Sequence, residues 1–259
     1  MSRLESSHSS FRLAVGLVMF LLPVQAVLAS TNKSGAPRSK PATAKNHSAA
    51  SSHPKSANRG DKVSGAQERL AALGYWTSRV DGVVDPGSRN ALIAFQKAEG
   101  LPRTGRLSPA DLKAISQAVP IAPRERGYYH VEVDLDHQIL FFVDDNGRVS
   151  NVLPISTGGG EEFTSEGWTR EAITPRGRFQ VHDKIAGWHK GPLGRIYYPN
   201  YILGSLAIHG YPSVPVHPAS HGCIRIPMFA ARRFSEMTPV GTVVLVYGSR
   251  RPGIESLNH

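Results

Sequence analysis

The sequence predicts a mainly β domain, expected to be a sandwich, preceded by a small three-helix domain. Apolar residues recur at helical spacing between residues 61 and 119, then alternate with polar residues from residue 129, and only one convincing helix follows. With 259 residues and 40% hydrophobic content, the chain can bury one good-sized core and one smaller core. We therefore expect five segments: 1–29, 30–60, 61–119, 125–248 and a C-terminal tail, 249–259.

The first segment, residues 1–29, has the composition of a Sec-type signal peptide. Arg3 and Arg12 precede an apolar run, residues 13–29, which is short, is interrupted by Pro23 and ends in the sequence VLA. An uncleaved N-terminal anchor is the alternative, and a lipoprotein is excluded because no cysteine follows the run. We expect an exported protein of the periplasm or the cell wall, or a secreted one.

The second segment, residues 30–60, is predicted to be a disordered basic linker. It contains no acidic residue and almost no large apolar one, so it cannot bury enough surface to offset chain entropy. Together with the net charge of +10, its cations favour an anionic partner, and a wall polymer or lipid head groups fit better than nucleic acid. A merely solvated linker is an equally good alternative. The cations are Lys33, Arg38, Lys40, Lys45, Lys55 and Arg59.

The third segment, residues 61–119, is predicted to form three short helices. Glycines at positions 74 and 100 end the first two. The third begins with Ser108 as N-cap, Pro109 at the first helical position and Asp111 near the unpaired amides. The expected inward residues are Val63, Ala66, Leu70 and Leu73, then Ala91, Leu92 and Phe95, then Leu112 and Ile115.

This segment resembles a peptidoglycan-binding domain. The residues that carry the resemblance are AQERLAALGYW, VDGVVDPGSRNALIAFQ and GLPRTGRLSPADL. Two positions depart from the family pattern, since Ala66 replaces a leucine and a glycine expected soon after Gly82 is displaced to Gly87. The resemblance implies that the helices hold the protein on the wall without taking part in bond making, and a folded spacer is the alternative.

The fourth segment, residues 125–248, shows strand periodicity. Residues 129–135 alternate, residues 139–143 are apolar throughout, and Asn146-Gly147 predicts a hairpin turn. Further strands are expected at 152–155, 206–209 and 242–247, and a helix at 227–237 with Met228, Ala231 and Phe234 on its inner side. The polar stretch 158–172 is expected to be a loop, either a mobile lid or a disordered connection.

The only cysteine, Cys223, lies in the stretch IHGYPSVPVHPASHGCIRI. In an exported protein a lone thiol cannot form a disulfide within its chain, so a chemical role competes with an inert buried one. His209 and His221 are candidate bases, and His217 is a weaker one. Gly222 allows close backbone approach and a turn whose N–H groups could bind an oxyanion, and Arg225 adds positive charge. A zinc site is a less favoured alternative, because one residue between His221 and Cys223 is not typical zinc spacing.

The same residues resemble the signature of the L,D-transpeptidase catalytic domain. His209 is followed by SHGCIR at 220–225, and the turn TPRGRF at 174–179 also matches. The resemblance implies a β-sandwich-like domain in which Cys223 is the nucleophile and His209 accepts and returns the proton. It assigns supporting or oxyanion roles to Ser220, His221, Gly222 and Arg225. In many members the spacing from histidine to cysteine is longer and a serine stands where this chain has Gly210.

The resemblance also implies a reaction that needs no cofactor and no metal. Cys223 would attack the third residue of a peptidoglycan tetrapeptide stem and release D-alanine, and an acceptor stem would then form a 3-3 cross-link during cell wall biogenesis, which determines cell shape. The implied partners are donor and acceptor stems, with no nucleic acid, and carbapenem-type β-lactams should acylate the thiol. Two alternatives stay open: an L,D-carboxypeptidase, in which water replaces the acceptor amine, and a non-catalytic wall-binding protein.

Overall fold

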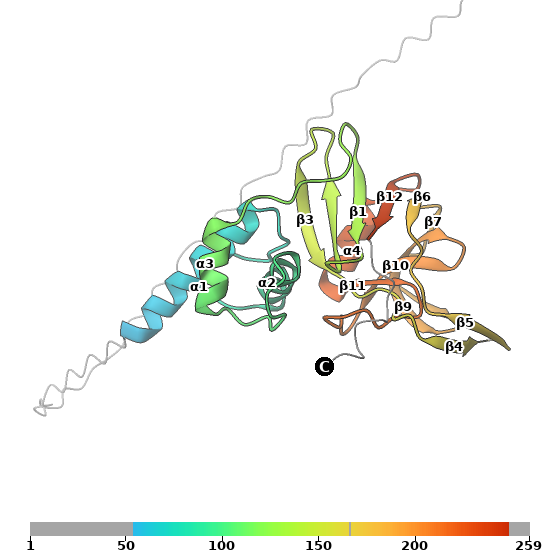
Figure 1. Cartoon of the computed structure of the whole chain (residues 1–259), viewed down its shortest axis with the longest axis horizontal. Coiled ribbons are helices and arrows are strands. Elements are labelled where there is room, and N and C mark those ends of the chain that lie inside the picture. The colour runs from blue at the N-terminus through green and yellow to red at the C-terminus, as the bar shows by residue number, and fades with distance from the viewer. Residues whose placement is uncertain (1–53, 166, 249–259) are drawn as a thin grey trace, which may run out of the picture. The chain divides into compact units, whose positions relative to one another are not determined.

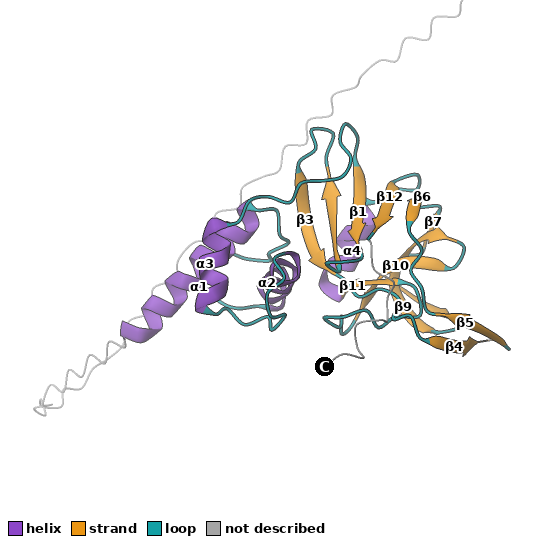
Figure 2. Cartoon of the chain, viewed as in Figure 1, coloured by secondary structure: helices purple, strands orange, loops and turns teal. Residues whose placement is uncertain are grey.

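The structure, a computed structural model, describes residues 54–165 and 167–248. The predicted signal peptide, most of the predicted linker and the whole predicted C-terminal tail lie outside these residues. Figure 2 shows that helices dominate the N-terminal part and strands the rest. The helices are α1 (Pro54–Ala72), α2 (Pro86–Ala98), α3 (Pro109–Gln117) and α4 (Met228–Met237).

The three predicted N-terminal helices are confirmed, with one correction at the start of α1. The N-cap of α3 is Ser108, whose hydroxyl accepts from the amide of Asp111, while the Asp111 carboxylate accepts from the amide of Ser108. Gly74 follows α1 at φ +91°, a conformation that favours glycine. The predicted linker extends too far, because α1 begins at Pro54 and residues 54–60 are helical. A proline is compatible with the first turn of a helix, so Pro54 can stand at the start of α1.

Two larger sheets, one two-stranded sheet and α4 follow in the rest of the described chain (Figure 1). The strand order of the first sheet is β3-β2-β1-β12-β6, with β1 parallel to β12 and the other neighbours antiparallel. It comprises β1 (His130–Asp134), β2 (Ile139–Val143), β3 (Val149–Pro154), β6 (Gly177–Gln180) and β12 (Val243–Tyr247). The predicted strands and the turn at Gly147, at φ +76°, are therefore confirmed.

The second sheet has the order β11-β10-β9-β7, and β8 also pairs with β9. It comprises β7 (Asp183–Lys184), β8 (Trp188–Gly191), β9 (Gly194–Leu203), β10 (Leu206–Tyr211) and β11 (Ile224–Pro227). The helix α4 packs between the sheets, as its buried Phe234 contacts Phe142 of β2 with ring centroids 5.3 Å apart. Ala231 of α4 and Ile208 and Ile224 of the second sheet belong to the same core. This core fixes β10 and β11, the strands that flank the cysteine motif.

The first sheet is buried on both faces at β2, whereas its edge strand β6 is mostly exposed. Leu140 and Phe142 point into the core between the sheets, whereas Ile139, Phe141 and Val143 point into a core shared with the helices. Leu70, Leu73 and Phe95 are among the residues that the helices contribute to it. A strand covered on both sides is expected to be apolar throughout, as β2 is.

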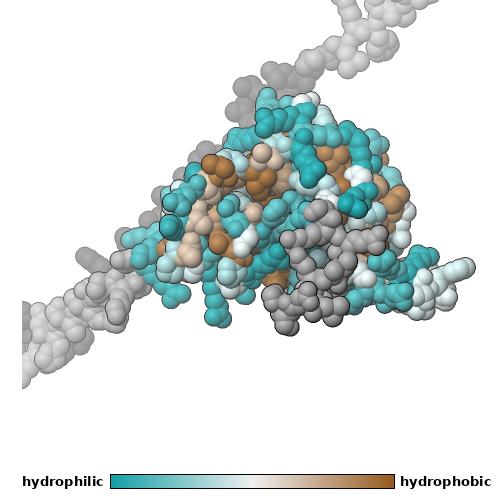
Figure 3. All heavy atoms as spheres, in the orientation of Figure 1, coloured by the Kyte–Doolittle hydropathy of each residue, from teal (hydrophilic) through white to brown (hydrophobic). Residues whose placement is uncertain are grey.

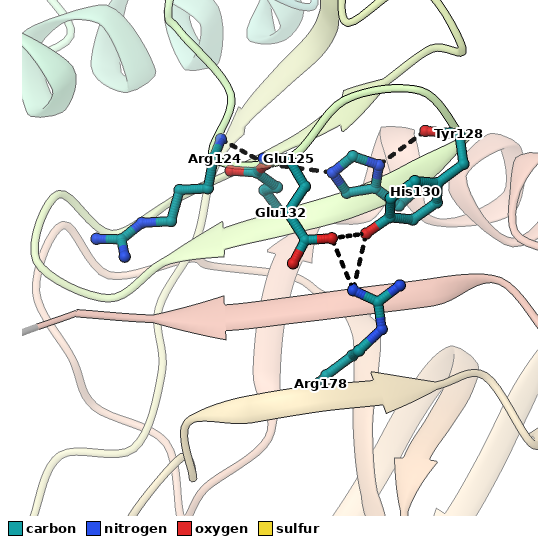
Figure 4. Close-up of polar contacts among 6 residues, drawn as sticks. All are labelled: Arg124, Glu125, Tyr128, His130, Glu132 and Arg178. Atoms are coloured by element: carbon teal, nitrogen blue, oxygen red, sulfur yellow. Dashed lines mark hydrogen bonds and ion pairs between the residues drawn. The ribbon is translucent and has the colours of Figure 1, made fainter.

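The alternation along β1 suggested an exposed polar face, but His130 and Glu132 are both fully buried. The Glu132 carboxylate accepts hydrogen bonds from the amides of Arg124 and Glu125, and the His130 ring lies 3.2 Å from it (Figure 4). The other ring nitrogen of His130 lies 2.9 Å from the carbonyl of Tyr128. Burial is tolerated because Oε1 of the carboxylate and both ring nitrogens of His130 have partners, whereas Oε2 of Glu132 has no hydrogen bond within the described residues. Through the Glu132 carboxylate, the connection between α3 and β1 is hydrogen-bonded to the first sheet.

Residues 158–172 were expected to be a loop, and this was wrong in part. They contain a two-stranded hairpin, β4 (Glu162–Ser165) and β5 (Trp168–Glu171). Every described side chain of β5 is exposed, including Trp168. Because the hairpin has no buried face, its sequence lacks the apolar alternation by which a strand is predicted.

In the parts of the chain that the structure describes, none of the helices is long and apolar enough to cross a membrane. On the face shown in Figure 3, hydrophobic residues form scattered patches between hydrophilic ones.

Candidate active site

Cys223 lies directly before β11, at the open end of the second sheet, and is partly exposed. Its thiol donates a weak hydrogen bond to the carbonyl of Ser205, 3.9 Å away. Burial raises the pKa of the thiol above its ordinary value, and the Ala207 amide and the Arg225 charge oppose this shift. The resting thiol is therefore largely protonated at neutral pH and needs a base to become a nucleophile.

His209 lies on the neighbouring strand, β10, which runs parallel to β11. It is opposite Arg225 in the register, and since strand side chains alternate, Cys223 lies on the same face as Arg225. His209 and Cys223 therefore lie on the same side of β10 and of the residues that lead into β11. No hydrogen bond joins their side chains among the residues that the structure describes, so a proton transfer between them would require the ring and the sulfur to approach each other.

The His209 ring is oriented by its own strand. Its Nδ1 lies 3.0 Å from the carbonyl oxygen of Gly210, which can only accept, so Nδ1 carries the proton and Nε2 keeps its lone pair. Burial lowers the pKa of His209 to about 4, and the Arg225 charge acts in the same direction. The ring is a neutral acceptor at neutral pH.

Gly210 is required by packing. A Cβ at this position would lie 2.6 Å from the Cβ of Ala231 in α4 and 3.2 Å from a ring carbon of Tyr197. A serine therefore does not fit at position 210, and the backbone carbonyl, which needs no side chain, orients the histidine.

The turn that precedes Cys223 is held by Ser220. The Ser220 hydroxyl donates to the Cys223 carbonyl at 2.5 Å and accepts from the Gly222 amide at 3.0 Å. Gly222 has φ +127°, and a Cβ there would lie 2.9 Å from the carbonyl oxygen of Ile173, so glycine is required. Since the Gly222 amide is already bonded within the turn, it is not a free oxyanion donor in this structure.

Arg225 supports the same turn and adds charge to the site. Its guanidinium donates to the carbonyl of Ala219 at 3.0 Å and lies over the ring of Tyr211, 4.2 Å from the ring centroid. Its charge contributes to the pKa shifts of both His209 and Cys223. Arg225 is thus a structural support of the turn and an electrostatic neighbour of both candidate reactive groups.

The other histidines of the motif lie on the surface. The exposed His221 contacts Phe163 of β4, with ring centroids 4.6 Å apart, so it links the turn to the hairpin. His217 is exposed, and its carbonyl accepts from the hydroxyl of Ser156 at 2.8 Å. Within residues 54–165 and 167–248, no group of three or more His, Cys, Asp or Glu side chains could hold a metal ion.

Sequence reasoning missed three supporting residues. The Thr157 carbonyl accepts from the amides of Ala219 and Ser220, and Thr174 donates to the Gly222 carbonyl at 2.5 Å. Burial, with a smaller effect of the Cys223 sulfur, raises the pKa of Tyr201. Only Thr174 had a signal in the sequence, because it begins the TPRGRF turn.

Comparisons with known proteins identify the family of each part of the chain. Residues 128–246 match the YkuD family, described as the L,D-transpeptidase catalytic domain, and residues 59–115 match the family described as "Putative peptidoglycan binding domain". The crystal structure of an L,D-transpeptidase from Xylanimonas cellulosilytica, residues 123–326, is 40% identical. The match covers 72% of this chain and 93% of that one, with a TM-score of 0.68. The chain belongs to the L,D-transpeptidase family.

Two further similarities are weaker or shorter. The L,D-transpeptidase (Yku) from Stackebrandtia nassauensis is 23% identical with a TM-score of 0.45, over 74% of this chain and 94% of that one. A curated protein of Synechocystis sp., "Putative OxPP cycle protein OpcA", is 42% identical over 59 residues, which are 23% of this chain. The chain matches only 12% of that relative's length. The match with the Xylanimonas cellulosilytica structure confirms the L,D-transpeptidase fold and the N-terminal helical region expected from the sequence.

Proposed function

We propose that this L,D-transpeptidase family member catalyses acyl transfer on peptidoglycan stems through Cys223. The observation that supports it best is that a partly exposed thiol, directly before β11, and a neutral, oriented imidazole on β10 lie on the same side of these paired strands. Such a pair can generate a thiolate when a substrate carbonyl arrives, and the neighbouring Arg225 favours the negative charge.

The proposed reaction has two halves. The Cys223 sulfur attacks the carbonyl of the third stem residue while its proton passes to Nε2 of His209, and the same proton then leaves with the D-alanine amine. In the second half, the side-chain amine of an acceptor stem attacks the thioester and gives its proton to His209. The sulfur leaves, takes up that proton, and a 3-3 cross-link remains.

Transfer to water, giving an L,D-carboxypeptidase, is the second candidate. The partial exposure of Cys223 is compatible with either acceptor. The product distinguishes the two, because an amine acceptor gives a cross-linked dimer and water gives a tripeptide. A non-catalytic wall-binding protein is disfavoured, since binding alone requires neither the thiol nor the oriented imidazole.

The helical unit offers the candidate surface for wall binding. A groove of about 660 Å³ lies between its helices, with an apolar floor that includes Val63 and Leu92. Four cations and no carboxylate are among its lining residues: Arg59, Lys62, Arg89 and Arg106. The groove therefore suits a wall polymer that carries carboxylates or phosphates. Action on this polymer places the protein in the periplasm or the cell wall, after export.

The test of the proposed function is the intact mass of the protein after incubation with a tetrapeptide stem or a carbapenem. Wild type should gain the mass of one acyl group on Cys223, and Cys223→Ser should gain none because a hydroxyl is far less easily ionised than a thiol. The melting temperatures should agree within a few degrees. An adduct of equal yield on Cys223→Ser would contradict the proposal.

A further inference from the structure

The side chain of Lys97, on α2, is buried in the protein although it carries an amine. It is 1% exposed, and no carboxylate forms an ion pair with it among the residues that the structure describes. Its Nζ donates instead to two main-chain carbonyls of the catalytic domain, Ile155 at 2.6 Å and Gln138 at 3.2 Å. A lysine is almost never fully buried without partners. The two hydrogen bonds to main-chain carbonyls therefore offset the cost of burying the Lys97 amine.

The carbonyls that Lys97 holds belong to the segment that supports the cysteine turn. Gln138 has φ +55°, an unfavourable conformation for a residue with a side chain. Its amide group bonds to Thr157 in both directions, donating to the hydroxyl at 2.7 Å and accepting from the main-chain N–H at 3.1 Å. The carbonyl of Thr157 then accepts from the amides of Ala219 and Ser220, both at 2.9 Å. Ser220 holds the turn before Cys223.

Ile155 leads to the same place by a second route. The next residue, Ser156, exchanges two main-chain hydrogen bonds with Arg225, at 2.9 and 3.1 Å. Arg225 lies opposite His209 on β10 and follows Cys223 by two residues. The segment 155–157 therefore contacts both sides of the reactive cysteine and connects it to Lys97 within a few bonds.

A second cation of the helical unit reaches the same region. Arg103, in the connection between α2 and α3, donates to the carbonyl of Val216 at 3.0 Å. Val216 lies in the loop that leads to the cysteine turn, next to His217, whose carbonyl is held by Ser156. Two donors of the helical unit thus bind two neighbouring chain segments: Lys97 binds segment 155–157, and Arg103 binds segment 216–220. Hydrogen bonds from Ala219 and Ser220 to the Thr157 carbonyl join these segments to each other.

We propose that Lys97, assisted by Arg103, is a positioning residue for the reaction of Cys223. The helical unit then helps to hold the cysteine turn in its reactive geometry. The proposal rests on the proposed acyl transfer. It revises the expectation that the helices act only in wall attachment. Loss of the Lys97 amine should let segment 155–157 shift, and with it Arg225 and the turn, which together set the environment of the sulfur.

The test compares Lys97→Met with Leu73→Ala in the full chain. Methionine keeps most of the apolar volume of lysine and removes the donor, whereas Leu73→Ala weakens the same helix–sheet core without touching the two carbonyls. The rate of Cys223 acylation and the pH profile of its alkylation are measured at a temperature where circular dichroism shows both variants folded. Lys97→Met should slow acylation about tenfold or more and shift the alkylation profile to higher pH. Leu73→Ala should lower the melting temperature and leave both unchanged.

The outcomes separate this inference from the proposed function. If wild type is not acylated at all, the proposed function fails, and the alkylation profile alone then decides on Lys97. If wild type is acylated and Lys97→Met matches Leu73→Ala in rate and in profile, the positioning role is overturned. Should Lys97→Met fail to fold, Arg103→Met carries the test, because Arg103 is only partly buried. It should change the same two measurements in the same direction, and no change would overturn the inference.

Discussion

His209 and Arg225 lie directly opposite one another on the parallel strands β10 and β11. This register brings a positive charge next to the imidazole, and the charge adds to burial in lowering the pKa of His209 to about 4. The imidazole is thereby kept neutral and able to accept a proton, and Cys223 lies on the same face. The first two predictions follow from this relationship.

Replacing the proposed base should slow the chemistry and leave the fold intact. We expect His209→Ala to lower the acylation rate of Cys223 by a hundredfold or more, because general bases typically contribute that much. The measurement is the time course of the acyl adduct by intact mass. His221→Ala is the matched control, since His221 contacts Phe163 on the surface and should act on stability and substrate placement. A larger rate loss for His221→Ala would exchange the two roles.

The stability of the protein should decrease on acidification because of His209. Its pKa is about 4 in the folded state and about 6.5 when unfolded, so between these values the unfolded state binds more protons. The free energy of unfolding should therefore fall as the pH falls from 6.5 to 4, by on the order of 3 kcal/mol. Urea titrations at pH 7 and 4.5 measure this difference. His209→Gln should show a smaller difference, and an equal one would contradict the assignment.

Gly210→Ser should destabilise the protein, although related domains carry serine at this position. The added Cβ would meet Ala231 at 2.6 Å, and overpacking of a buried contact typically costs about 1–3 kcal/mol. The double variant Gly210→Ser/Ala231→Gly should recover part of this loss, less the cost of about 1 kcal/mol for a glycine inside a helix. Thermal unfolding measures both. Without any recovery, Ala231 would not be the residue that excludes serine.

Charge in the helical groove should govern attachment to the wall. We expect Arg89→Ala/Arg106→Ala to reduce co-sedimentation with purified sacculi and to weaken its dependence on salt. Arg79→Ala/Lys113→Ala is the control, because it removes the same charge from the same unit outside the groove. Equal losses in the two double variants would mean that overall charge, not the groove, determines binding.

Local signals in the sequence predicted much of the fold and the candidate site. Ser108, Pro109 and Asp111 predicted the start of α3 because capping depends on neighbours in the chain. The motif around Cys223 predicted the candidate pair because its spacing places one residue on β10 and the other directly before the neighbouring strand, β11. The residues that escaped prediction depend on distant partners. In the sequence, Lys97 cannot be distinguished from a lysine on the surface of a helix, because its partners, the carbonyls of Gln138 and Ile155, are distant in the chain.

Strands on the surface and polar residues in the interior were the other failures. The hairpin of β4 and β5 buries neither face, so hydrophobic periodicity could not reveal it. Glu132 occupies a position that alternation assigns to solvent, and its burial depends on the amides of Arg124 and Glu125 folding back over β1. Neither arrangement leaves a pattern in its own stretch of sequence.

The apolar outer face of β2 limits how this protein can be recombined with others. Ile139, Phe141 and Val143 are fully covered only because the helices rest on them. A fusion that carries the catalytic domain alone would expose this apolar surface and be prone to aggregation. A different wall-binding domain would have to cover the same surface to replace the helices. The helical unit and the catalytic domain should therefore be transferred together when this protein is recombined with others.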